Sequence, residues 1–119
     1  MKLTKETHAN LKALLAAVEF LADNMDRSAP LHNVQLFLQI ADATANGEAL
    51  EVNELQRQLG MTSSALSRAL GAIGQWSYTD QPGLDLVVAK PDYSDRRRKP
   101  MTLTDKGEKL AIAATKMIH

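Results

Sequence analysis

The sequence predicts a mainly helical fold that carries one small β-hairpin. Three observations support this prediction. Apolar residues recur at helical spacing in several segments of the 119-residue chain. Gly60 separates two of these segments by a short turn, and two β-type stretches within residues 84–104 flank a polar turn. Because a chain of this length can bury one core, we expect a single domain over residues 1–119.

The first two helices are expected over about residues 4–25 and 31–45. The first carries one apolar stripe, and Pro30 lies beyond its end because proline cannot continue a helix interior. The second ends at the pair Asn46-Gly47, which is typical of a helix C-terminus. Residues 49–52 are expected to form a very short strand. The expected buried residues of the second helix are Val34, Phe37, Leu38 and Ala41.

Two further helices are expected over about residues 53–59 and 63–75. Asn53 is the expected N-cap of the first, Gly60 supplies the turn, and one residue of Thr62-Ser63 caps the second. A short helix, a glycine turn and a second helix form a helix-turn-helix pattern. The residues expected to be buried in it are Leu55, Leu59, Leu66, Leu70 and Ile73.

The outer face of the second of these helices carries small, hydroxyl-bearing or cationic side chains. Such a face suits a helix that enters a major groove, because small residues allow close approach and an arginine can read guanine or bind the backbone. The alternative interpretation is an ordinary solvated helix face. The residues on this face are Ser63, Ser64, Ser67, Arg68, Gly71 and Gln75.

A hairpin and a last helix complete the expected fold. Residues 76–83 form a loop, residues 84–88 and 99–103 pair as antiparallel strands, and a helix starts at Thr104 as its N-cap. This order of elements predicts a winged helix-turn-helix with the hairpin as the wing. We therefore divide the chain into an N-terminal helix over 1–27, a helical core over 31–76 with the helix-turn-helix at 53–75, a wing over 84–104 and a C-terminal helix over 104–119.

The tip of the expected wing holds the densest positive charge of a chain with no net charge. Residues 91–119 carry seven cations and four acids, whereas residues 1–50 carry four and six. A sequence-reading protein needs positive charge mainly at its contact surface, and arginine can enter a narrow minor groove. The alternative is an exposed charged turn. The cations at the tip are Arg96, Arg97, Arg98 and Lys99.

Three stretches of the chain resemble the MarR family of transcriptional regulators. VNELQRQLGMTSSALSRAL is similar to the family's helix-turn-helix, including the step Ser67-Arg68. GLDLVVAKPDYSDRRRKPMTLTDKG is similar to its wing, with Asp92 and Asp95 ahead of the arginines. Leu103-Thr104 followed by Lys106-Gly107 matches the family's LT-x-x-G start of the next helix. The resemblance covers about residues 30–110.

The resemblance implies a homodimer that binds a pseudo-palindromic site in double-stranded DNA, usually as a repressor and sometimes released by a small-molecule effector. It also implies that Asp95 and Arg97 brace the wing by an ion pair, and that one of the tip arginines reaches the minor groove. The expected DNA-binding residues are Thr62, Ser63, Ser64, Ser67, Arg68, Arg96, Arg97, Arg98 and Lys99.

Two features depart from the family pattern. Only one short helix follows the wing, where the family has one or two long dimerisation helices, so we expect a compact variant. The loop WSYTDQPG at residues 76–83 is longer than the family's link. The apolar stripes of the first and last helices still favour dimerisation over packing within one subunit. The expected dimerisation residues are Leu11, Leu14, Leu15, Val18, Leu21, Leu110, Met117 and Ile118.

Composition argues against several other classes. The chain has no cysteine, its three histidines are far apart, and it lacks phosphate-loop and nucleophile motifs, so we expect no enzyme, no metal site and no cofactor. It has no membrane-length apolar run and no secretory signal, and we expect a cytoplasmic protein.

Two alternatives of different kinds stay open. The first is a winged-helix adaptor or anti-regulator that binds protein, with Trp76 and Tyr78 as anchors. The second is an origin-binding replication or partition protein that uses the same DNA face.

Overall fold

The computed structural model describes residues 3–75, 82–90 and 100–118. Helices dominate this part of the chain, and one two-stranded antiparallel sheet joins them, so the predicted fold class is confirmed. The elements are α1 (Lys5–Asn24), α2 (Leu31–Ala45), α3 (Val52–Leu59), α4 (Ser63–Ile73), β1 (Val87–Ala89), β2 (Met101–Leu103), α5 (Asp105–Thr115) and the short 3₁₀-helix η1 (Lys116–Ile118).

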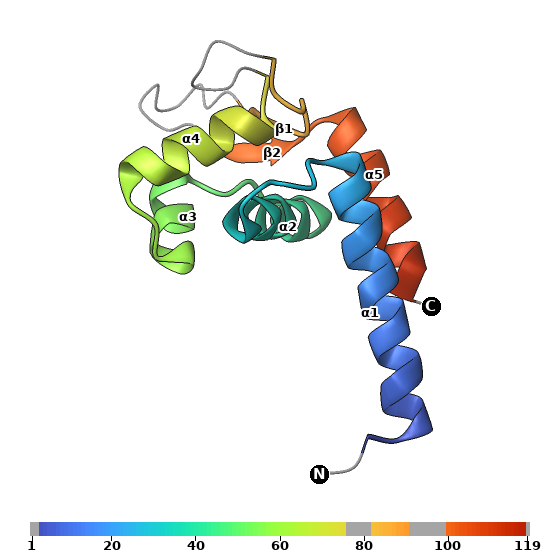
Figure 1. The fold of residues 1–119 in the computed structure, drawn as a ribbon. Coiled ribbons are helices and arrows are strands. Elements are labelled where there is room, and N and C mark those ends of the chain that lie inside the picture. The colour runs from blue at the N-terminus through green and yellow to red at the C-terminus, as the bar shows by residue number, and fades with distance from the viewer. Residues whose placement is uncertain (1–2, 76–81, 91–99, 119) are drawn as a thin grey trace.

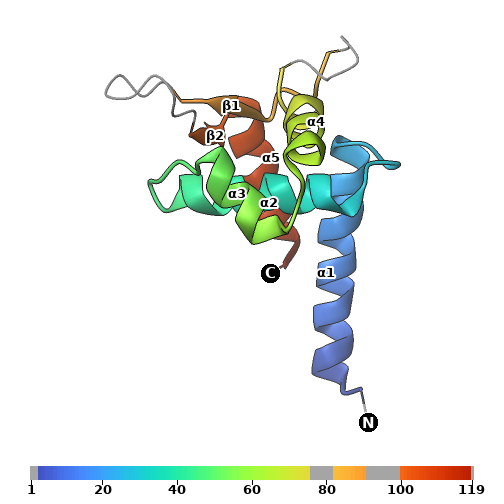
Figure 2. The same cartoon turned by 90° about the vertical axis from the view of Figure 1, so that its left-hand side faces the viewer.

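The helix α2 lies at the centre of the molecule (Figure 1). It packs on α3, α4, β2 and α5, whereas α1 packs on α5 and η1 at one side. Figure 2 shows that the N-terminal part of α1 projects beyond the other elements. The molecule is accordingly elongated, with extents of 52 × 30 × 28 Å.

The hydrophobic core forms around α2 and lies between the helix-turn-helix and the hairpin. Leu36, Phe37 and Ile40 on α2 have no solvent exposure. Leu55 on α3 and Leu66 on α4 belong to the same core and are fully buried, as predicted. The other side chains with less than 2 % exposure are Ile73, Leu86 and Val87.

The prediction of the buried face of α2 was partly wrong. Leu38 was expected inside but is 44 % exposed, whereas Leu36 and Ile40 are fully buried. Because neighbours surround α2 on several sides, its buried face is wider than the stripe read from the sequence. The exposed stripe that remains contains Leu31, Gln35, Leu38 and Asp42.

Side chains cap three helix N-termini, of which those at Thr62 and Thr104 were predicted and the one at Thr4 was not. The hydroxyls of Thr4, Thr62 and Thr104 each accept a backbone N–H three residues on, at 3.0–3.1 Å. Gly60 has φ of 63° and supplies the left-handed turn between α3 and α4. Asn53, however, is not the N-cap of α3, because the helix already begins at Val52.

The β-structure is shorter than predicted. Within residues 3–75, 82–90 and 100–118, only Val87–Ala89 and Met101–Leu103 form strands, with Val87 opposite Leu103 and Ala89 opposite Met101. The strand expected at residues 49–52 is reduced to one bridge, in which Leu50 and Met101 exchange both backbone hydrogen bonds. The helix α4 ends at Ile73 instead of residue 75, because Gly74 leaves the helical conformation.

Candidate nucleic-acid interface

The helices α3 and α4 are joined by a turn that leaves the outer face of α4 open. The N–H of Met61 donates to the carbonyl of Gln56 at 3.2 Å, which closes the turn after Gly60. Leu66 and Ile73 turn inward and are fully buried. The opposite side of α4 therefore faces solvent, as the helical period requires.

The side chains predicted to contact DNA lie together on this outer face. Ser63, Ser64, Ser67 and Arg68 are all exposed, within one and a half turns of the N-terminus of α4. Within the described residues, Arg68 has no ion pair and no hydrogen bond, so its guanidinium is available for an outside partner. Thr62 uses its hydroxyl oxygen to accept from Ala65 N, which fixes the first turn beside them.

The cationic tip of the wing lies outside the described residues. This applies to Asp95, the arginines at 96–98 and Lys99, and also to Trp76 and Tyr78, so their predicted roles stay predictions. The base of the wing is described, and there the N–H of Lys90 donates to Pro100 O at 2.7 Å. Lys90 is exposed and adds a cation that our sequence analysis did not consider.

Thr44 attaches the wing to the centre of the fold. Its hydroxyl donates to Ile40 O at 2.8 Å, accepts from Leu103 N at 3.2 Å and lies 3.1 Å from the hydroxyl of Thr102. These bonds join β2 to α2, on which α4 also packs. The wing and the outer face of α4 are thus held by one common element.

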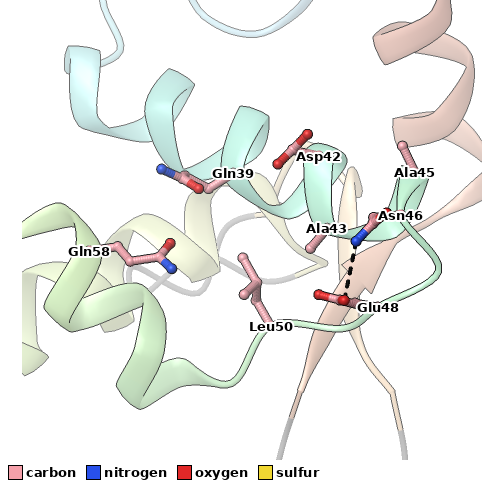
Figure 3. A pocket seen from close by; sticks show the side chains of 8 residues that line it. All are labelled: Gln39, Asp42, Ala43, Ala45, Asn46, Glu48, Leu50 and Gln58. Atoms are coloured by element: carbon pink, nitrogen blue, oxygen red, sulfur yellow. Dashed lines mark hydrogen bonds between the residues drawn. The ribbon is translucent and has the colours of Figure 1, made fainter.

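A hollow between α2, α3 and the loop after α2 has the opposite electrostatic character (Figure 3). Its volume is about 370 Å³, and the carboxylates of Asp42 and Glu48 lie in its lining. Asn46 Nδ2 donates to Glu48 Oε1 at 3.2 Å across its rim. Because carboxylates repel phosphates, the lining of this hollow lacks the charge that favours nucleic acid.

A second cavity, of about 220 Å³, lies where the end of α1 meets α2 and the last turn of α4. Its lining includes Met25, Asn33 and Ile73. Asn33 is 8 % exposed, and its Oδ1 is the one buried side-chain oxygen or nitrogen in residues 3–75, 82–90 and 100–118 that lacks a hydrogen-bond partner. The cavity therefore combines apolar lining side chains with Asn33, whose Oδ1 lacks a hydrogen-bond partner in the described part of the chain.

The predicted dimerisation residues divide into exposed and buried groups. Leu21 and Leu110 are 5 % and 8 % exposed and belong to the chain's own core, because α1 packs on α5, so their assignment to a dimer surface was wrong. Ile112, which our sequence analysis missed, is 57 % exposed. The exposed apolar residues on α1, α5 and η1, which we call the apolar stripe, are Leu11, Leu14, Leu15, Val18, Ile112, Met117 and Ile118.

No family model matches the sequence, and no curated protein does. Solved structures do match. The chain is similar to MepR of S. aureus in a complex with DNA, at 20 % identity over 85 % of this chain and 71 % of that one, with a TM-score of 0.62. The chain has the winged-helix fold of MarR-family regulators.

Two further structures of MarR-family regulators extend the comparison. MarR matches at 15 % identity over 96 % of this chain and 75 % of that one, with a TM-score of 0.59. Overoxidized AbfR bound to DNA matches at 20 % identity over 94 % and 73 %, with a TM-score of 0.57. The MarR-family resemblance read from the sequence is thereby confirmed for the fold.

Among the described residues, no helix has the length and apolarity needed to cross a membrane. In the same part of the chain, no three histidines, aspartates or glutamates are grouped so that they could hold a metal ion.

Proposed function

We propose that this protein is a transcriptional regulator that binds a specific double-stranded DNA sequence. The observation that carries the proposal is the outer face of α4, where Arg68 has no partner among the described residues and three exposed serines precede it. This face has the chemistry that a major groove requires: hydroxyls for phosphates and base edges, and a guanidinium for guanine. The DNA complexes of MepR and AbfR, which share the fold, support the same assignment.

In this proposal, the regulator acts as a homodimer on a pseudo-palindromic site. The apolar stripe supports it, because leucines such as Leu14 and Leu15 are each 57 % exposed on a helix that projects from the body. A two-fold axis through this stripe would place two α4 helices about 34 Å apart, one turn of DNA.

We propose that the protein represses transcription. It would act in the cytoplasm, where the DNA that it binds would lie. Thr62 and the serines would contact phosphates and base edges. One of Arg96, Arg97 and Arg98 would reach the minor groove, and Lys99 would contact a phosphate. Asp95 would brace Arg97. The small-molecule effector stays a prediction, and the proposal includes no enzymatic activity.

The proposal is tested by selecting binding sites from a pool of random double-stranded DNA at two salt concentrations, with light scattering to give the mass of the protein. We expect a pseudo-palindrome bound by a dimer. Absence of any enriched sequence would contradict the proposal and favour a protein-binding adaptor. Binding to a replication origin, with no effect on transcription, would favour the origin-binding alternative.

A matched pair of variants identifies the recognition surface. Arg68→Ala removes the unpaired guanidinium of α4, whereas Arg57→Ala removes one from α3 that already pairs with Glu54. We expect Arg68→Ala to weaken binding to the selected site by about 1–3 kcal/mol and Arg57→Ala to have a much smaller effect. Equal losses would show that only total charge matters.

A further inference from the structure

Leu84, Asp85 and Leu86, which we call the junction, lie between the end of α4 and the start of α5. Their three backbone N–H groups all donate to carbonyls at the C-terminal end of α4, which α4 itself leaves unpaired. The bonds run from Leu84 N to Ala72 O at 2.9 Å, from Asp85 N to Gly74 O at 2.7 Å and from Leu86 N to Ile73 O at 2.8 Å.

The three backbone carbonyls of the junction accept hydrogen bonds from the start of α5. Each amide of this segment is thus bonded to one helix and each carbonyl to the other. The bonds run from Lys106 Nζ to Leu84 O at 2.8 Å, from Thr104 Oγ1 to Asp85 O at 2.6 Å and from Thr104 N to Leu86 O at 3.0 Å.

Glycines allow the close approach of backbone on both sides of the junction. A Cβ on Gly83 would lie 2.1 Å from Gly74 O, and a Cβ on Gly107 would lie 2.1 Å from Leu86 O. Both distances are far below a van der Waals contact, so even a methyl group would push the helices away. The packing therefore leaves little freedom in how the ends of α4 and α5 sit on the junction.

Asp85 has φ of 57°, the left-handed conformation that a residue with a side chain adopts at a cost. It holds this conformation while its N–H and its carbonyl bond to different helices. The surrounding hydrogen bonds maintain a backbone geometry that an isolated chain would avoid.

We propose that the junction fixes the orientation of α4 relative to α5 and thereby sets the distance between the two α4 helices of a homodimer, with Thr104 and Lys106 as positioning residues. This inference rests on the function proposed above. The helix α5 and its neighbour α1 carry the apolar stripe, and α4 carries the outer face of Arg68. Both helices pack on α2, and the junction is hydrogen-bonded to both.

The first test changes Lys106 and uses Lys109 as the control. Lys106→Met removes the Nζ donor and keeps an unbranched stem, and Lys109→Met removes the same charge three residues on. Lys109 is exposed and has no hydrogen bond or ion pair in the described part of the chain. Affinities are measured for the selected DNA site and for the same site with one base pair added or removed between its halves.

We expect the wild type and Lys109→Met to prefer the same spacing. In Lys106→Met, the ratio of the affinities for the preferred and the altered spacing should fall about fivefold. This is the equilibrium effect of losing one typical net hydrogen bond. The same spacing preference in both variants would overturn the positioning role of Lys106.

The second test measures amide hydrogen exchange of the free protein at Leu84, Asp85 and Leu86. Thr104→Val removes the hydroxyl and should raise exchange at these amides about fivefold, and Thr104→Ser should restore protection. Lys106→Met should raise exchange as well and leaves the N-cap of α5 intact, so its result does not depend on the folding of a cap variant.

The two tests separate this inference from the proposed function. If the wild type selects no DNA sequence, the proposed function fails, and hydrogen exchange still decides whether α5 holds the junction. Unchanged exchange in both Lys106→Met and Thr104→Val would overturn the inference. A rise in exchange without a change in spacing preference, in a wild type that selects DNA, would overturn the positioning role.

Discussion

The core around α2 and the apolar stripe of α1 have similar side chains but different surroundings. Phe37 and Leu36 of the core have no solvent exposure, because α3, α4 and β2 pack around them. Leu14 and Leu15 of the stripe are each 57 % exposed, because α5 and η1 pack on another face of α1 and, among the described residues, these two side chains stay open to solvent. Apolar composition alone therefore does not distinguish a residue that stabilises the subunit from one that is available to a second subunit.

The largest expected effect tests the core. Phe37→Ala removes an aromatic ring from a fully enclosed site and should lower the free energy of unfolding by about 3–5 kcal/mol. Urea unfolding followed by circular dichroism measures this loss. A loss below about 1 kcal/mol would mean that Phe37 is not enclosed as described.

A smaller effect, on association instead of folding, is expected in the stripe. Leu14→Lys should change the free energy of unfolding of the subunit by no more than about 0.5 kcal/mol, yet weaken self-association by about 30-fold or more. Sedimentation equilibrium over a concentration series measures the association. Leu38→Lys is the control, because Leu38 is 44 % exposed on α2, outside the stripe. Equal weakening in both variants would argue against the stripe as the dimer surface.

The third prediction concerns a polar side chain that is buried inside the folded subunit. Asn33→Leu replaces a buried amide whose Oδ1 lacks a partner by an apolar side chain of similar size. We expect a gain of about 1 kcal/mol in unfolding free energy, because an unsatisfied buried acceptor costs about that much. Thermal unfolding of the two proteins provides the measurement, and a lower melting temperature in the variant would indicate that Oδ1 has a partner in solution.

The smallest expected effect concerns the exposed turn between α1 and α2. The backbone N–H of Ser28 and then its hydroxyl donate to Asp26 and lower the pKa of that carboxyl from its usual 3.8. The pKa of Asp26 is therefore lower in the folded protein than in the unfolded chain, so the ionised carboxyl stabilises the folded state. This stabilisation is present above the unfolded pKa and is lost as pH falls through the folded pKa.

Ser28→Ala tests this turn, because it removes the hydroxyl donor and keeps the backbone donor. The pKa of Asp26 should rise part of the way to 3.8 in the variant, while the apolar stripe and the core stay unchanged. An NMR titration of the Asp26 carboxyl follows the change. Identical titration curves in variant and wild type would mean that the hydroxyl has no effect on the carboxylate.

Local sequence signals predicted the helices well. The bounds of α2 agree with the prediction to the residue, and Thr104 caps α5 as expected, because capping and helix-breaking depend on neighbours in the chain. Leu55 and Leu66 were correctly assigned to the core by helical spacing.

Features that depend on several elements at once were not predicted. The burial of Leu36 and the exposure of Leu38 depend on which neighbours surround α2, and spacing along one helix does not contain this information. The junction was read as ordinary strand, because Leu84 and Leu86 look like strand residues and nothing local reveals that Asp85 adopts a positive φ. The exposed face at Ser67 and Arg68 was predicted because it follows directly from the period of α4.

The N–H of Gly83 donates to the carbonyl of Gln75 at 2.9 Å, so these two described residues, which lie on either side of residues 76–81 in the sequence, are bonded to each other. The entropy of closing a chain segment between two bonded residues grows only slowly with its length, so adding residues between Gln75 and Gly83 would cost little while this bond and the junction remain. This segment is therefore a place where evolution can change the length of the chain without altering how α4 is held. It is also a suitable insertion site for a fluorescent or affinity tag.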